Sequence, residues 1–166
     1  ITVFDQGEPV VYDFVFNGWG MKFAANLDNL VTRNLSVQGT FAGGVQVINM
    51  QPFVLEGGSI ESDGKGTLLT TVECLSSQNR NEYLQKEELE AYLKDVFGFE
   101  RILWLENGYL AGDDTDSHID TLARFCREDT IAYVQCKDES DEHFEELQAM
   151  EQELQAFRQA DGKPYR

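Results

Sequence analysis

The chain has 166 residues, of which 42% are hydrophobic, a composition typical of a globular protein with one packed domain. Thirty acidic residues against thirteen basic ones give a net charge of -17, which argues against nucleic acid or an anionic membrane surface as a partner. The mean hydropathy of -0.39 and the scattered apolar runs argue against a membrane span. A small cationic substrate would instead be attracted by this charge.

Strands and one helix are predicted in the first third of the chain. Apolar alternation indicates strands at 2–4 and 10–16, joined by a turn at 6–9. Apolar residues then recur at helical spacing over 27–35. Glycines end this helix before strand-forming residues between 45 and 55.

The next segment repeats this order. Residues 59–61 and 67–71 are predicted to form a hairpin around a turn with two glycines. Residues 86–97 carry apolar side chains on one helical face, and Gly98 is a natural helix end. Residues 101–105 are predicted to form the following strand.

The last third of the chain is predicted to contain a hairpin and a long helix. Alternation predicts a strand at 118–126, which could pair with 131–136 through the turn at 127–130. A helix is expected over 141–160. Such units recur about every seventy residues without a linker. We therefore expect an α/β fold and a single region, 1–166.

Three cysteines, Cys74, Cys126 and Cys136, show no CxxC spacing and no Cys/His ligand pattern. An odd number without such spacing favours a reducing cytoplasm, and no metal site is expected. None has a neighbouring base that would make it a nucleophile. The chain begins with Ile rather than Met, so we expect its first residue to come from truncation or processing.

One of the two histidines, His118, lies among four carboxylates within 113–120. Carboxylates beside a histidine orient its ring, as general acid/base chemistry requires. On the predicted strand, His118 and Asp120 are two residues apart and would point to the same side. Two plainer interpretations stay open: a solvated acidic loop, or an aspartate that only satisfies a half-buried histidine.

A second candidate is Glu56, which follows an apolar strand and precedes Gly57 and Gly58. The glycines would let the backbone approach a ligand closely, and a carboxylate matches the paired N–H groups of a guanidinium. The same pattern also occurs in ordinary turns. Trp19, between two glycines, could place its indole at the wall of a pocket, but it is expected to be a packing residue. His143 is expected to be solvated.

Four segments together resemble the agmatine deiminase family, also known as bacterial-type peptidylarginine deiminases. They are FNGWG at 16–20, EGGSIESDGKGT at 56–67, NRN at 79–81 and DDTDSHID at 113–120. The resemblance implies the pentein fold, a five-bladed α/β propeller of ββαβ units, of which this chain would supply about two blades. It also implies hydrolysis of agmatine to N-carbamoylputrescine and ammonia through a cysteine nucleophile and an amidino-thioether, without a cofactor.

The resemblance assigns roles to individual residues. His118 would be the general acid/base, and Glu56 and Asp120 would bind the guanidinium. Asp114 would face the distal amine of agmatine, with Asp113 and Asp116 as alternatives. Two family motifs are absent, Arg-Asp-x-Gly-Pro and the glycine-rich segment with the nucleophilic cysteine. We therefore expect a central fragment of a pentein catalytic domain that releases no ammonia from agmatine by itself.

Other functions stay open at this stage. A deiminase acting on arginine or on peptidyl arginine would need a pocket for a carboxylate or a backbone, and Asp114 argues against one. A noncatalytic pentein-like binding module is the alternative outside the enzymes. Uncovered blade interfaces would also favour self-association of the chain.

Overall fold

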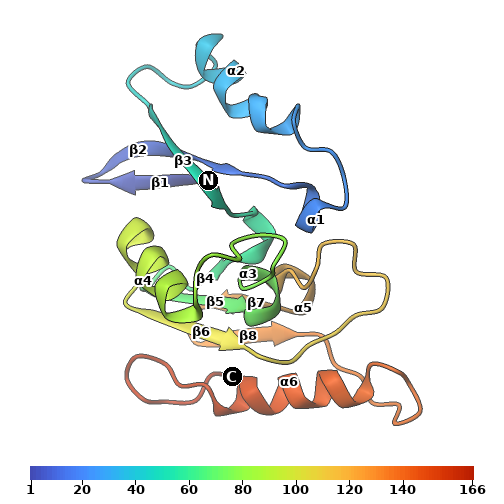
Figure 1. Cartoon of the computed structure of the whole chain (residues 1–166). Coiled ribbons are helices and arrows are strands. Elements are labelled where there is room, and N and C mark those ends of the chain that lie inside the picture. Colours follow the sequence, from blue (N-terminus) through green and yellow to red (C-terminus); the bar gives the residue numbers. More distant parts are fainter.

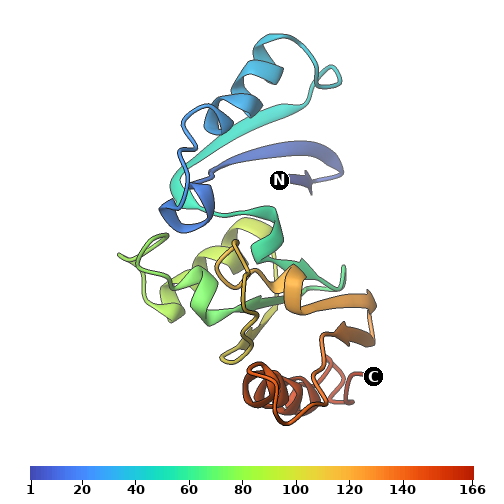
Figure 2. The same cartoon turned by 90° about the vertical axis from the view of Figure 1, so that its right-hand side faces the viewer.

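A computed structural model describes all residues from Ile1 to Arg166. Figure 1 shows three tiers: a first unit of strands and helices at the top, a second unit in the middle, and a long helix at the bottom. In Figure 2 the first unit and this helix again lie at opposite ends, with the second unit between them. None of the helices combines the length and the apolar composition that crossing a membrane requires.

The first unit is a three-stranded sheet in the order β1-β2-β3. Its strands are β1 (Thr2–Asp5), β2 (Glu8–Val15) and β3 (Gln46–Val54). β1 pairs with β2 antiparallel through the two-residue turn Gln6-Gly7, where both residues have positive φ (48° and 88°), as a tight hairpin turn requires. β2 pairs with β3 in parallel, so the chain must cross over between them. Three helical segments make the crossover: α1 (Gly18–Met21), η1 (Asp28–Leu30) and α2 (Val31–Val37).

The second unit repeats this topology. β4 (Glu61–Ser62) is antiparallel to β5 (Thr67–Thr71), and β5 is parallel to β6 (Arg101–Leu105). Helices α3 (Val72–Leu75) and α4 (Lys86–Phe97) form the crossover. The expected ββαβ repeat is confirmed, and α4 and β6 have the predicted bounds. Gly98 ends α4 in the left-handed conformation, at φ 72°.

A third hairpin and a long helix follow. The elements are α5 (Ile119–Leu122), β7 (Ala123–Arg127), β8 (Thr130–Tyr133) and α6 (Phe144–Ala156). β7 and β8 are antiparallel, as expected. The helix is shorter than the predicted 141–160, because Asp141 bonds the backbone of His143 in the preceding turn and Phe157 is already extended.

Two apolar clusters form the core, and β5 lies between them. All five residues of this strand are therefore buried. Adjacent side chains of a strand point to opposite faces. Leu68 accordingly joins the cluster shared with the first unit and α4, and Leu69 joins the cluster under β7, β8 and α6. The second unit is thereby fixed from both sides, and its strand ends carry the site described below.

The predicted strand over His118–Cys126 is wrong in its first half. Residues 119–122 form the helical turn α5, and the strand begins only at Ala123. Ile119 and Leu122, three residues apart, both enter the core, which a helical turn allows and an extended strand does not. The alternation of apolar residues in this segment concealed that spacing.

Candidate active site

Glu56 lies just after β3, where Gly57 begins the short helix η2 (Gly57–Ser59). Its backbone is extended, and its carbonyl accepts bonds from Ser59 N and Oγ at 3.0 and 2.6 Å. The carboxylate is directed into the interior, and only 6% of the residue is exposed. A charge at such a position requires partners.

His118 is the first partner, because its Nε2 lies 2.6 Å from Glu56 Oε2. The histidine immediately precedes α5 and is also buried, at 4% exposure. Its carbonyl accepts bonds from the amide and the hydroxyl of Thr121, which anchors the residue to the following turn. The buried carboxylate therefore fixes one ring nitrogen and leaves Nδ1 for other chemistry.

Asp120 and His118 converge at Gly58. A Cβ atom at Gly58 would lie 2.5 Å from His118 Nδ1 and 2.7 Å from Asp120 Oδ2. The two side chains thus approach the same point, although a helical turn and not a strand brings them together. Asp120 is exposed, so a ligand can reach its carboxylate. The absence of a side chain at position 58 is what makes this approach possible.

Arg80 is the second partner of Glu56. It lies in the NRN segment at 79–81, but no role was predicted for it. Its Nη2 and Nε lie 2.6 and 3.1 Å from Glu56 Oε2, the oxygen that His118 also contacts. Glu56 Oε1 accepts the backbone N–H of Trp19 at 3.1 Å. Because these donors occupy the carboxylate, Glu56 is placed to hold His118. We had expected it to bind the guanidinium of a substrate directly.

The charges of the cluster are balanced by these contacts. Burial alone would raise the pKa of Glu56, but the hydrogen bond with His118 and the charge of Arg80 outweigh burial, and the pKa lies below its usual range. Cys74 lies nearby, and burial raises the pKa of its thiol to about 12. Such a thiol stays protonated at neutral pH and is a poor nucleophile.

Donor atoms of Glu56, Cys74 and His118 lie within 4.8 Å of one another. Three such donors could in principle hold a metal ion. The guanidinium of Arg80, however, is 2.6 Å from the carboxylate oxygen that would have to coordinate it. Its positive charge opposes the binding of a cation there.

The three aspartates of the acidic loop before His118 make different contacts. Asp113 caps the loop, since its two carboxylate oxygens accept the amides of Thr115 and Ser117 at 2.9 and 2.8 Å. Burial would raise the pKa of Asp113, but the hydrogen bond from the hydroxyl of Thr115 and the two amide bonds outweigh burial and lower this pKa. Asp116 forms an ion pair with Lys22 at 2.6 Å. Asp114 is exposed, and only its backbone carbonyl is bonded, by Lys22 Nζ at 3.0 Å.

Trp19 lies in a turn whose four residues, 18–21, all have positive φ, between 57° and 77°. This left-handed turn is costly for residues with side chains, and it is held by Asn17, whose Oδ1 accepts the N–H of Gly20 at 2.9 Å. The indole packs edge-on against Phe16 and Phe23. Trp19 therefore is a packing residue, as expected, and in addition a wall of the cavity beside His118.

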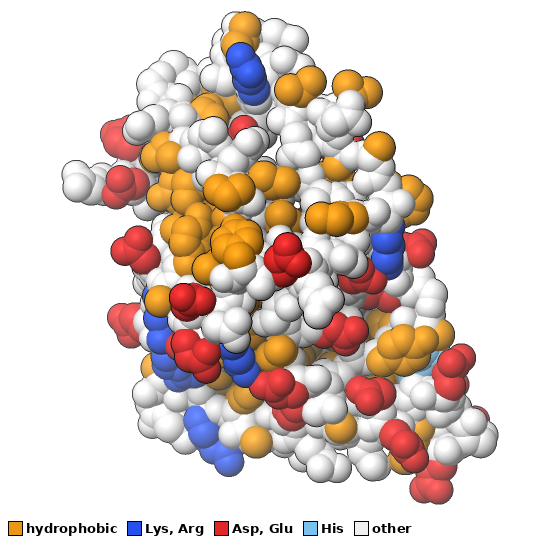
Figure 3. All heavy atoms as spheres, in the orientation of Figure 1, with side chains coloured by type: hydrophobic (Ala, Val, Ile, Leu, Met, Phe, Trp, Pro, Cys, Tyr) orange, Lys and Arg blue, Asp and Glu red, His pale blue; other side chains and the backbone are white.

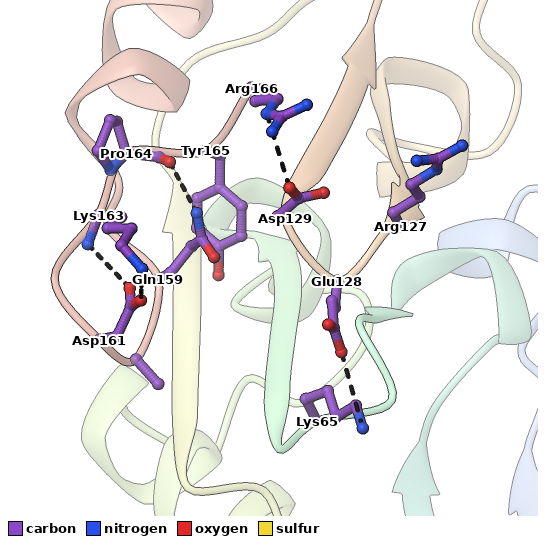
Figure 4. A pocket seen from close by; sticks show the side chains of 11 residues that line it. Lys65, Arg127, Glu128, Asp129, Gln159, Asp161, Lys163, Pro164, Tyr165 and Arg166 are labelled. Carbon is purple, nitrogen blue, oxygen red and sulfur yellow. Dashed lines mark hydrogen bonds and ion pairs between the residues drawn. The ribbon is translucent and has the colours of Figure 1, made fainter.

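That cavity has a volume of about 720 Å³. Its polar lining includes Glu56, His118 and Asp120, together with Asp13, Tyr12 and the Thr residues 32, 115 and 121. Asp114 is not among its lining residues. A larger cavity of about 1090 Å³ lies near the C-terminus (Figure 4). Its lysines and arginines largely face acidic partners, as in the pairs Lys65–Glu128 and Lys163–Asp161. It contains no histidine, cysteine or buried carboxylate, so the smaller cavity is the better candidate.

Comparison with known proteins gives the chain a family context. The family model of the Porphyromonas-type peptidyl-arginine deiminases matches residues 1–166. The agmatine deiminase of Ectopseudomonas mendocina (strain ymp) is 35% identical over 164 residues, which cover 95% of this chain and 43% of that protein.

Two solved structures of agmatine deiminases are also similar. A Cys-to-Ser variant from C. jejuni with substrate bound has a TM-score of 0.87 and 46% identity, and the match covers 94% of this chain and 46% of that one. The enzyme of Enterococcus faecalis has a TM-score of 0.84 and 33% identity, over 97% and 44% of the two chains. The chain thus spans less than half the length of these relatives.

Proposed function

Because the chain belongs to the Porphyromonas-type peptidyl-arginine deiminase family, we propose that the protein hydrolyses the guanidinium group of agmatine. The products are N-carbamoylputrescine and ammonia. The observation that carries the proposal is the histidine at the cavity: Glu56 fixes His118 Nε2, while Nδ1 and the carboxylate of Asp120 meet at Gly58. Such a pair provides a proton carrier and a guanidinium acceptor side by side.

The first half of the reaction breaks a C–N bond. A cysteine thiolate, which the family resemblance places outside these 166 residues, attacks the guanidinium carbon and forms a C–S bond. Asp120 binds N–H groups of the guanidinium and keeps it oriented. His118 donates a proton to the departing nitrogen, the C–N bond breaks, and ammonia leaves an amidino-thioether behind.

The second half restores the enzyme. His118 now takes a proton from a water molecule, and the resulting hydroxide attacks the same carbon. The C–S bond breaks and its electron pair returns to the thiolate, while the added hydroxyl loses its remaining proton to solvent and becomes the carbonyl. N-carbamoylputrescine is then released. Glu56 does not touch the substrate in this scheme but holds the ring of His118 in both half-reactions.

Asp114 is proposed to bind the distal amine of agmatine. Unlike Asp113 and Asp116, its carboxylate is not engaged by the loop or by Lys22, and it is exposed. An anionic loop beside the cavity favours a substrate with two positive charges over arginine, whose carboxylate it would repel. The names of the relatives from E. mendocina, C. jejuni and E. faecalis agree with this choice.

Ammonia release by the full-length gene product tests the proposal. We expect turnover of agmatine and much slower turnover of arginine and of a peptide with an internal arginine. Asp120→Asn should abolish turnover, because the carboxylate that binds the guanidinium is lost. Asp5→Asn, which changes an exposed aspartate on β1, serves as the matched control. Preference for arginine or for the peptide would contradict the assignment of the substrate.

We further propose a cytoplasmic location and association of the chain with a second copy. The location is supported by three cysteines that are all free.

Association is supported by apolar side chains exposed on the first unit, such as Phe4, Leu27 and Val37, which are 75%, 71% and 81% exposed. Figure 3 shows hydrophobic side chains gathered over the upper part of the molecule. A monomer in light scattering at high concentration would contradict association.

A further inference from the structure

Arg80 is among the most buried charged residues of the chain, with 1% of its side chain exposed. It follows α3 and is the central residue of the NRN segment at 79–81, which the family resemblance includes without assigning Arg80 a role. A guanidinium at this depth is stable only if its N–H groups have acceptors. The acceptors that it uses therefore indicate its role.

The five N–H groups of Arg80 all face acceptors within the protein. Nε and Nη2 donate to Glu56 Oε2 at 3.1 and 2.6 Å, and Nη2 also donates to the carbonyl of Thr115 at 2.7 Å. Nη1 faces the carbonyls of Cys74 and Asp116, both at 3.4 Å. No N–H group is left for a substrate, so Arg80 can act only through the groups that it holds.

These acceptors belong to three segments of the chain. Glu56 follows β3, Cys74 is in α3, and Thr115 and Asp116 belong to the loop that leads to His118. Asp116 has a φ of 57°, and Ser117 after it a φ of 63°, a conformation that residues with side chains rarely adopt. Arg80 thus holds a strained loop and the carboxylate that this loop must meet.

Arg80 and His118 contact the same oxygen of Glu56. An arginine is always charged, so its contact favours the ionised carboxylate at every pH at which the protein is folded. An ionised Glu56 accepts the N–H of His118, whereas a protonated one would compete as a donor. The carboxylate is therefore useful to His118 only in the state that Arg80 imposes.

We propose that Arg80 is a positioning residue of the active site, which keeps Glu56 in its accepting form and anchors the loop of His118. The inference rests on the proposed function, since it names a residue that supports the same reaction. Arg80 and His118 contact Glu56, and the thiol of Cys74 on α3 lies near its carboxylate. The other titratable groups of the neighbouring elements are Asp113 and Asp116 on the loop and Asp120 at α5.

Two variants of the full-length gene product separate charge from geometry. Arg80→Gln removes the charge that favours the ionised form of Glu56. We therefore expect the acidic limb of the plot of kcat against pH to move to higher pH by about one unit or more. Arg80→Lys keeps the charge but cannot make five contacts, so the limb should stay in place while kcat falls about tenfold or more with little change in KM. Arg124→Gln, which removes an exposed arginine paired with Glu61 at 2.9 Å, is the matched control and should do neither.

A folded Arg80→Gln protein with an unshifted limb, or an Arg80→Lys protein with wild-type kcat, would overturn the inference. If neither variant folds, the wild-type protein is measured: slow hydrogen exchange of Arg80 Nε–H by NMR supports the contacts, and fast exchange overturns them. If the wild-type protein does not hydrolyse agmatine, the proposed function fails, whereas NMR titration of Glu56 in Arg80→Gln still tests the inference.

Discussion

Glu56 and His118 are 62 positions apart in the chain, yet their Oε2 and Nε2 atoms lie 2.6 Å apart in the interior. The contact joins the end of a strand of the first unit to the turn that opens the third hairpin. Its partners are a fixed cation, Arg80, on one side and a cavity on the other. The stability of the fold and the chemistry of the site therefore depend on the same carboxylate.

Replacement of Glu56 with Gln should destabilise the protein by about 3–5 kcal/mol, because a buried guanidinium loses its counter-charge. The pKa of Glu56 is lowered on folding, so its contribution to stability is present above the ordinary value of 4.5 and is lost as the pH falls through the lowered value. Urea unfolding from pH 7 down to pH 3 measures this. A Glu56→Gln protein with the same stability and the same acid dependence as the wild type would contradict the role of the pair.

A methyl group at Gly58 should reduce kcat/KM about a hundredfold, because its Cβ would lie 2.5 Å from His118 Nδ1 and displace the ring. Gly57→Ala is the matched control, since a Cβ there has no neighbour within 4 Å. Steady-state kinetics of both variants in the full-length gene product checks this. Equal activity of the two would show that Gly58 does not set the approach.

Part of the site and part of the fold could be predicted from the sequence. Glu56, His118 and Asp120 were predicted as site residues because each lies in a short recognisable sequence pattern: a carboxylate between an apolar strand and two glycines, and a histidine among carboxylates. The structure brings these three residues together. The helix 86–97 and the strand 101–105 were predicted from apolar spacing and a terminal glycine. Arg80 could not be predicted in this way, since its acceptors lie at positions 56, 74, 115 and 116 and meet only in the folded chain.

Gly20→Ala should cost more stability than Gly39→Ala. Both glycines have positive φ, 77° and 67°, so each substitution carries a backbone cost of about 1–2 kcal/mol. Only the new Cβ at position 20 meets another group, Asp116 Oδ2 at 2.6 Å, and it would push the loop of His118. Thermal unfolding and agmatine turnover compare the two. Equal losses would mean that the turn at 18–21 does not support the loop.

Asp114→Asn should raise the KM for agmatine about tenfold, because an exposed charge pair with the distal amine is lost. Stability should not change, since the carboxylate of Asp114 makes no contact that holds the loop. Asp5→Asn is again the control. Unchanged affinity for agmatine would remove Asp114 from the site and reopen the choice between agmatine and arginine.

Alkylation by iodoacetamide at neutral pH should label Cys126 and Cys136 well before Cys74. The thiol of Cys74 is buried and has a pKa raised to about 12, whereas Cys126 is exposed. Peptide mass spectrometry over a time course gives the three rates. Fast labelling of Cys74 would show that solvent enters the cluster around Glu56.

The proposed function requires His118 to carry protons at a guanidine-hydrolysing centre. Ammonia release from agmatine by the full-length gene product measures this role with the variant His118→Gln. His143→Gln, at the residue that precedes the far helix α6, is the control. We predict that His118→Gln lowers kcat at least about a thousandfold while the protein stays folded, and that His143→Gln retains wild-type turnover. A folded His118→Gln protein that hydrolyses agmatine at the rate of the control would contradict this role.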